Sequence, residues 1–213
     1  IETPLWLRVF PDLKDPALNR VMAWQGGLGM PDREYYLAPG DARFATAMEA
    51  YRAYLVKLAR LAGQRDADGV AQRVIALETA LAQTHAKREE LMDPTRMYNP
   101  MDAAALSAHA PKFAWGAFLA AASLPAVQSL TVTHPASLRA AVELLSERPL
   151  ADWKLYFRMR TLDGHANVLP QAFRDARFAF RGVGLGGATA PEPRWQQGIA
   201  VLNGALGEAV GQL

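Results

Sequence analysis

The chain has 213 residues, of which 51% are hydrophobic and 21% are charged, a composition typical of globular proteins and not of disordered or fibrous ones. Lys and Arg number 23 against 21 for Asp and Glu, and the charges are interspersed, so the sequence gives no support to a nucleic-acid or membrane-surface role. There is no cysteine, which excludes disulfides and thiolate metal sites, and no apolar stretch is long enough to predict a membrane span.

The N-terminal part of the chain predicts a β-hairpin with a long loop. Residues 5–10 and 21–24 are rich in β-formers, and prolines and aspartates lie between the two runs. We expect the hairpin to cover about residues 5–25. The glycine-rich stretch that follows, residues 27–32, is expected to be irregular.

Two long helices are predicted next. Asp41 is suited to cap the first helix, and Gly63 is suited to end it. The second helix is predicted from about Asp68 to Leu91, with Pro94 marking a boundary beyond it. Both show apolar residues at helical spacing, which are Phe44, Met48, Tyr51, Leu55 and Leu58 in the first helix and Val70, Val74, Leu77 and Leu81 in the second.

Shorter elements follow in the middle of the chain. Pro111 is predicted to lie in the first turn of one helix, and Pro135 in the first turn of another, which runs through Leu145. Between them, residues 129–133 form a short stretch rich in β-formers, for which we expect an extended conformation.

The C-terminal third predicts further helices. The helical pattern between Pro149 and Arg181 is interrupted at Asp163-Gly164 and at Pro170, so we expect a kink or two helices. The last helix is predicted to begin near Glu192, and its apolar stripe consists of Trp195, Ile199, Leu202, Leu206, Val210 and Leu213. Because the stripe has no terminator, we expect the natural chain to continue past Leu213.

The predicted fold class is therefore mainly α. We expect a multi-helix domain with a small N-terminal β-hairpin, in which residues 1–213 form a single segment and the helices extend from about residue 41 to residue 213.

The four histidines, His85, His109, His134 and His165, do not form a helical zinc motif, because no two of them are four residues apart. The set nearest to a metal site is Glu78, His85 and Glu89, which would lie near one face of the predicted second helix. We favour the simpler interpretation, which is a half-buried histidine among surface carboxylates.

The run from Gly182 to Gly187 has the spacing G-x-G-x-x-G of dinucleotide-binding loops. That motif requires a preceding strand and a helix that begins at the last glycine. Here the preceding segment is helical in pattern, and Pro191 and Pro193 follow. We therefore predict a loop between helices, in which the glycines allow positive φ values.

Other candidate chemistry is weak. There is no G-x-S-x-G motif of the serine-hydrolase type. Carboxylates that could pair as acid and base are Asp32, Glu34, Asp163 and Asp175, and the sequence gives no distance between them. Core packing is favoured over a binding platform for the five tryptophans, which are Trp6, Trp24, Trp115, Trp153 and Trp195.

The run from Gly27 to Tyr36, Gly-Leu-Gly-Met-Pro-Asp-Arg-Glu-Tyr-Tyr, resembles the G-L-G-x-P-[DS]-R-[DE]-Y-Y signature of the neprilysin (endothelin-converting-enzyme) family. The resemblance covers the chain nearly end to end. Further matches, in family order, are Leu77-Glu78, Ala80-Leu81-Ala82, Arg88, Asp93-Pro94, Tyr98-Asn99-Pro100-Met101, Phe113-Ala114-Trp115, Trp153-Lys154-Leu155-Tyr156 with Arg160, Arg194-Trp195, and residues 206–213.

The resemblance implies a role without catalysis for this segment. Family members are zinc metallopeptidases in which a catalytic domain and a mainly helical domain enclose a cavity that admits peptides but not folded proteins. This chain resembles the helical domain. The family's zinc ligands, the histidines of H-E-x-x-H and a downstream glutamate, would lie beyond residue 213. No catalytic, metal-binding or substrate-binding residue is therefore assigned here, and zinc is expected in the full-length parent protein only.

Two functions stay open. In the first, the segment restricts the access of peptide substrates to the active site, with the catalytic domain of the same polypeptide as its partner. In the alternative, it is a catalytically dead helical binding or interaction module from the same family. An H-E-x-x-H motif in the reading frame past Leu213 would distinguish the two. The absence of cysteine and the many alanines and arginines suggest a bacterial member, for which a periplasmic or otherwise exported location is expected.

Overall fold

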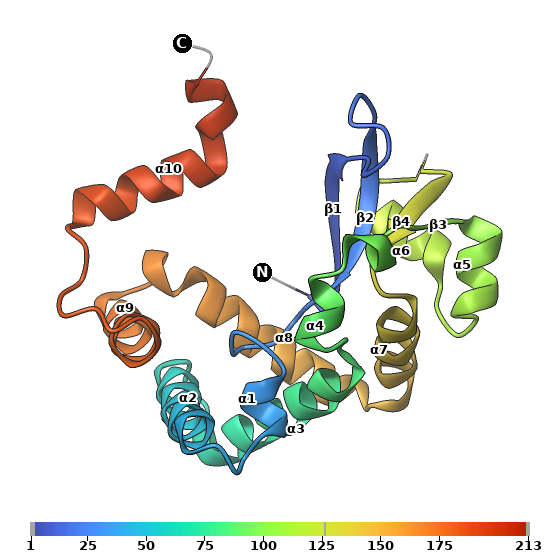
Figure 1. Cartoon of the computed structure of the whole chain (residues 1–213). Helices are drawn as coiled ribbons and strands as arrows, with labels where there is room; N and C mark the ends of the chain where they lie inside the picture. Colours follow the sequence, from blue (N-terminus) through green and yellow to red (C-terminus); the bar gives the residue numbers. More distant parts are fainter. Residues whose placement is uncertain (1–2, 126, 212–213) are drawn as a thin grey trace.

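The computed structural model describes residues 3–125 and 127–211. A small sheet lies at one end of the structure, a body of helices lies beside it, and the last helix stands apart from both (Figure 1). The predicted class, mainly α with a small N-terminal strand region, is confirmed.

The predicted hairpin forms part of a four-stranded sheet with the order β1-β2-β4-β3. Strands β1 (Leu5–Pro11) and β2 (Asn19–Gln25) pair in antiparallel fashion. Strand β4 (Ser129–Val132) is the extended stretch expected from the sequence, and it runs parallel to β2. Strand β3 (Asn99–Asp102) was not predicted, because Asn-Pro-Met-Asp contains poor β-formers, and it forms by backbone pairing with β4 at the edge of the sheet.

The first helices follow a short helix, α1 (Glu34–Leu37). Helix α2 (Ala42–Leu61) begins as predicted, because the Asp41 side chain accepts a hydrogen bond from the Arg43 N–H at 2.9 Å. The predicted role of Gly63 at its end is confirmed, since this residue has a φ of +74°.

The prediction for the second helix is wrong at its C-terminal end. Helix α3 (Ala67–Thr84) stops before His85, which is extended, and helix α4 (Arg88–Leu91) forms separately. Contacts with a distant segment explain the early end. The His85 ring bonds to the Gly26 carbonyl at 3.2 Å, and Arg33 donates to the His85 carbonyl. Such tertiary contacts are not visible in helical periodicity.

The middle of the chain is built from short elements. They are the 3₁₀ turn η1 (Pro94–Met97) and the helices α5 (Ala103–His109), α6 (Trp115–Ala121) and α7 (Pro135–Glu147). Pro135 opens α7 as predicted. The prediction that Pro111 opens a helix is wrong, because α6 begins only at Trp115.

The helical pattern between residues 149 and 181 forms four consecutive elements. They are α8 (Leu150–His165), the 3₁₀ turn η2 (Ala166–Val168), α9 (Gln171–Arg177) and the π-helix η3 (Phe178–Leu185). The predicted interruption at Pro170 is confirmed, whereas the one at Asp163-Gly164 is wrong, since both residues lie inside α8. The predicted loop at Gly182–Gly187 is wrong for residues 182–185, which are π-helical, and Gly187 alone of these glycines has a positive φ, +65°.

The last helix, α10 (Arg194–Val210), forms close to its predicted position. The end of its predicted stripe, Leu213 and the Val210 side chain, lies outside the described residues. Trp195, expected in a core, is 65% exposed, whereas Trp115 and Trp153 are buried as predicted.

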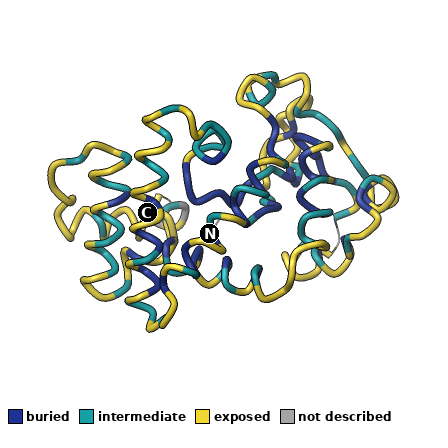
Figure 2. The backbone as a smooth tube through the Cα atoms, turned by 90° about the horizontal axis from the view of Figure 1, so that it is seen from below, coloured by how far each residue is buried: buried dark blue, intermediate teal, exposed yellow. Residues whose placement is uncertain are grey.

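One cluster of buried side chains joins the helical body to the sheet, and buried stretches run through both parts (Figure 2). Helices α2, α3 and α8 contribute its centre, where Leu58, Leu81 and Met159 are completely buried. The amphipathic spacing of these helices therefore has the packing role that the sequence predicts.

Truncation of a central leucine should be costly. We expect Leu58→Ala to lower the free energy of unfolding by about 2–5 kcal/mol, because it leaves a cavity in a fully buried site. Leu150→Ala is the matched control, and since Leu150 is 67% exposed its effect should stay within about 0.5 kcal/mol. Urea unfolding of both variants measures the difference, and equal effects would contradict this assignment of the core.

Candidate functional site

The segment at residues 27–36, called here the signature loop, lies against the helical body near two buried carboxylates. One is Glu78 of α3, which accepts a hydrogen bond from Tyr36 of the loop, and the other is Asp163 of α8, which is linked to the loop through Arg181. Both carboxylates accept hydrogen bonds from several side chains.

Glu78 is completely buried and accepts hydrogen bonds from two tyrosines. The Tyr36 hydroxyl donates to Oε2 at 2.8 Å, and the Tyr51 hydroxyl donates to the same oxygen at 2.9 Å. The Tyr36 hydroxyl also accepts from the N–H groups of Gly29 at 3.1 Å and Met30 at 3.0 Å. Backbone donors of the signature loop are thus connected through Tyr36 to Glu78.

Burial raises the pKa of Glu78 to about 7. The positive charge of Arg160 and the hydrogen bonds from the two tyrosines act in the opposite direction and limit the rise. Burial also raises the pKa values of Tyr36 and Tyr51, so both stay protonated and remain donors.

Asp163 has a different environment, because cations surround it. It accepts hydrogen bonds from Tyr54 at 2.8 Å, Arg181 at 3.0 Å, Arg177 at 3.1 Å and Arg160 at 3.2 Å. Burial raises the pKa of Asp163, but the hydrogen bonds and charges of these partners outweigh burial and hold the pKa below its usual value. Asp163 is therefore ionised at neutral pH.

Two further bonds hold the loop backbone. Arg181 donates to the Gly29 carbonyl at 3.1 Å, and Tyr156 donates to the Gly27 carbonyl. Gly27 has a φ of +89°, which disfavours other residues. At Gly29 an added Cβ would lie 1.8 Å from the Tyr51 hydroxyl oxygen. The two glycines of the signature are thus needed for conformation and for close approach.

We expect Gly29→Ala to destabilise the fold by about 1–3 kcal/mol or more, because the new methyl group overlaps the Tyr51 hydroxyl. Gly116→Ala in α6 is the control, since an added Cβ there meets nothing within 4 Å and alanine favours helix by about 1 kcal/mol. Denaturant unfolding of the two variants gives the comparison. If Gly29→Ala left the free energy of unfolding unchanged, the signature loop would not be packed against Tyr51 as described.

The ionisation of Glu78 should make stability depend on pH. Its folded pKa of about 7 lies above the ordinary 4.5, so its contribution to stability is fully present below about pH 4.5 and is lost as pH rises through about 7. We expect the unfolding free energy to fall over this interval relative to Glu78→Gln, which cannot ionise.

His85 also contributes to the pH dependence, with the opposite sign, because burial lowers its pKa to about 4. This contribution is present in both proteins, so subtracting the Glu78→Gln curve from the wild-type curve isolates Glu78. Chemical unfolding at a series of pH values measures both curves. If the unfolding free energies of the wild type and of Glu78→Gln changed in parallel with pH, the raised pKa of Glu78 would be contradicted.

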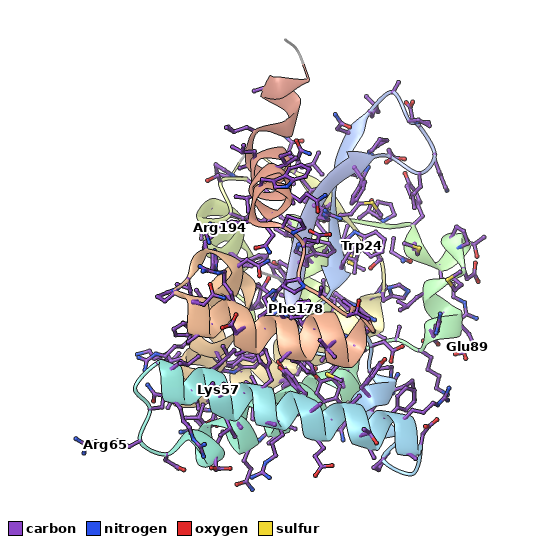
Figure 3. All side chains as sticks on the ribbon, turned by 90° about the vertical axis from the view of Figure 1, so that its left-hand side faces the viewer. Trp24, Lys57, Arg65, Glu89, Phe178 and Arg194 are labelled. Atoms are coloured by element: carbon purple, nitrogen blue, oxygen red, sulfur yellow. The ribbon has the colours of Figure 1, made fainter. Side chains whose placement is uncertain are left out.

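The three residues considered as a metal site do not come together. The Nε2–H of His85 donates to the Gly26 carbonyl at 3.2 Å, Glu78 is enclosed by tyrosines, and Glu89 is exposed on α4, at the edge of the view in Figure 3. The interpretation of surface carboxylates around His85 is therefore wrong for Glu78. Within residues 3–125 and 127–211, no group of three or more His, Asp or Glu side chains has the geometry to hold a metal ion. Zinc does not fit the side chains described here.

The carboxylates considered as acid and base each have a structural partner, and at Asp163 most of these partners are distant in sequence. The Asp32 side chain accepts from the Glu34 N–H at 2.7 Å, Asp175 accepts from Gln171, and Asp163 is paired with arginines. The sequence did not identify the Glu78 and Tyr36 pair as a site. A usable signal was present, because Glu78 falls on the apolar stripe of α3, where a charged residue needs a partner.

In the described part of the chain, no helix combines the length and the apolarity needed to cross a membrane. Fold and site together define a helical scaffold in which buried carboxylates position a glycine-rich loop. The family to which the chain belongs is more specific than this description of the scaffold. The model of Peptidase family M13, in its N-terminal part, matches residues 1–213, and the chain belongs to this family.

Relatives are identical to this chain at about a quarter of the aligned positions. Endothelin-converting enzyme 1 of Rattus norvegicus is 28% identical over 212 residues, which are 96% of this chain and 28% of the relative. Neutral endopeptidase of Lactobacillus helveticus is 26% identical over 208 residues, which are 98% of this chain and 32% of the relative. The chain thus spans about a third of the length of these relatives.

Solved structures agree with the fold. Mycobacterium tuberculosis zinc metalloprotease Zmp1, in complex with an inhibitor, is 29% identical and gives a TM-score of 0.91 over 100% of this chain and 33% of its own. PepO from Lactobacillus rhamnosis gives 0.76 at 18% identity, over 99% of this chain and 33% of its own, a likeness that concerns the fold alone.

Proposed function

We propose that residues 1–213 form one segment of the helical, cavity-enclosing domain of a zinc metalloendopeptidase, and that this segment restricts the access of peptide substrates to an active site beyond residue 213. The observation that carries the proposal is the length of the match: the whole chain corresponds to about a third of an inhibitor-bound zinc metalloprotease. We assign no catalytic or zinc-binding role to the residues of this chain.

The buried carboxylates support such a role. A wall that excludes large substrates must keep its shape, and closely packed elements joined by buried hydrogen bonds resist deformation. Here the Asp163 cluster joins α2, α8, α9 and η3, and the Glu78 cluster joins α2 and α3 to the signature loop. In the parent enzyme zinc would polarise the peptide carbonyl and activate a water molecule, with ligands from the catalytic domain.

The alternative is a helical interaction module without a catalytic partner. The exposed apolar face of α10 favours it, because such faces mark interaction sites. An H-E-x-x-H motif in the reading frame past residue 213 supports the peptidase, and a nearby stop codon supports the module. We also propose that the parent protein is a bacterial, exported enzyme. Relatives from Lactobacillus and Mycobacterium are peptidases, which supports the bacterial origin.

The access role is tested by loosening the wall of the complete enzyme. Tyr36→Phe removes a hydroxyl that is hydrogen-bonded to Gly29, Met30 and Glu78, and this should lower the free energy of unfolding by about 1–3 kcal/mol. We expect it to raise kcat/KM for a long or partly folded substrate several-fold relative to a short fluorogenic peptide.

Tyr35→Phe is the matched control, because the Tyr35 ring packs on Phe44 and the aromatic contact survives the change. It should leave the ratio of the two kcat/KM values unaltered. If Tyr36→Phe lowers stability and yet both substrates respond equally, the segment does not control access. Absence of peptidase activity in the complete polypeptide would favour the module instead.

A further inference from the structure

Helix α10 exposes bulky apolar side chains on one face. Trp195, Ile199, Leu202 and Leu206 follow one another at steps of four, three and four residues, and their exposed fractions range from 48% for Ile199 to 65% for Trp195. In the helical body the corresponding stripes are buried. A continuous exposed stripe of this kind indicates a surface that is covered in the working protein.

The opposite side of the same helix carries small residues, Ala200, Gly204 and Gly207, with the polar Gln196 and Gln197 beside them. An added Cβ at Gly204 or Gly207 meets nothing within 4 Å, so nothing in the described chain requires glycine there. Each interior glycine weakens a helix by about 1 kcal/mol relative to alanine. Glycines of this kind are explained when another backbone packs closely against them.

Charge is scarce on α10. In the sequence of the helix, residues 194–210, the charged residues are Arg194 and Glu208. A helix with few charges and a continuous bulky apolar stripe is typically packed against another element along that stripe. Isolated helices of this length are marginal in water, so α10 depends on packing for its stability.

Space for a covering segment lies beside the helix. One hollow of about 450 Å³ is lined by Phe178, by Arg194 and three further arginines and by two carboxylates among others, and Figure 3 shows Phe178 and Arg194 on one face of the molecule, on η3 and α10. A second hollow of about 600 Å³ is lined by residues that include Val168, Gly198 and Leu202. The body therefore does not fill the space next to α10.

We propose that α10 is an internal helix of the complete polypeptide, covered on both its bulky and its small face by residues of the same polypeptide outside 1–213. This inference rests on the proposed function, because it requires a longer parent chain. The partner is an apolar, closely packed part of that chain, and α10 connects the helical body to it.

A second copy of the chain fits the observations less well. A two-fold dimer covers the same patch on each copy, so a dimer through the bulky stripe leaves the glycines on the other side of α10 unexplained. A helix of 17 residues is about 25 Å long and about 10 Å wide. One face of it can therefore bury far less surface than a stable interface requires, which is about 800 Å² per partner. Zmp1, in addition, matches 100% of this chain while being about three times as long.

The test uses site-specific cysteine labelling of the natural polypeptide, expressed from its complete reading frame. The variants are Leu202→Cys on the bulky face, Ala200→Cys on the small face and Ala45→Cys on α2 as the matched control. All three positions are exposed in this structure. Reaction with a maleimide under native conditions is followed at each site by peptide mass spectrometry, and denatured protein gives the reference rates.

We expect the cysteines at 200 and 202 to react at least about tenfold more slowly than the one at 45 in the monomeric protein, because labelling must wait for local opening. Equal rates at the three sites overturn the proposal. So does protection that disappears on dilution, which would identify a second copy as the cover, or protection that requires an added peptide, which would identify a ligand.

Hydrogen exchange of the unmodified polypeptide provides a measurement that is independent of the substitutions. Peptides covering residues 195–206 should be as strongly protected as those of α3, and rapid exchange there contradicts the proposal. Neither readout depends on peptide cleavage. A failed access test with a protected α10 would therefore reject the proposed function alone, and the reverse result would reject this inference alone.

Discussion

The fold depends on how the signature loop is bonded to two buried carboxylates, directly to Glu78 and through Arg181 to Asp163. Loss of one partner from a buried ion pair or hydrogen-bond network costs several kcal/mol, because the remaining group stays buried and unsatisfied. Glu78 joins the loop to α2 and α3, and Asp163 joins α2, α8, α9 and η3. The mutual positions of these elements are therefore more tightly specified than apolar packing alone would require.

The two carboxylates meet the cost of burial in different ways. Asp163 keeps its charge because arginines from α8, α9 and η3 surround it, and its pKa is lowered. Glu78 has two tyrosine hydroxyls as direct partners and the charge of Arg160 at a greater distance, and burial raises its pKa to about 7. Asp163 thus stays charged at neutral pH, while Glu78, which accepts a hydrogen bond from Tyr36 of the loop, changes charge near neutral pH.

Much of the helical body could be predicted from the sequence, because the spacing in α2 and α3 and the cap at Asp41 are local signals. The errors arise where distant contacts decide. His85 leaves the helix to bond with Gly26, and β3 forms only because β4 lies beside it. The sequence also does not predict the π-helix η3. In this element Phe180 stacks on Tyr54 of α2, with 4.9 Å between the ring centroids, and no local sequence pattern indicates that contact.

The signature loop shows why a segment without assigned catalytic residues can still carry a specific sequence string. Its distinctive residues each have a structural role, since Gly27 supplies a positive φ, Gly29 allows close approach, and Asp32 caps the turn that begins α1. Arg33 and Tyr36 then bond to the His85 carbonyl and to Glu78. The string therefore reports a folded junction between loop and helices, and its recognition from sequence identified a fold and a family without locating any reaction chemistry.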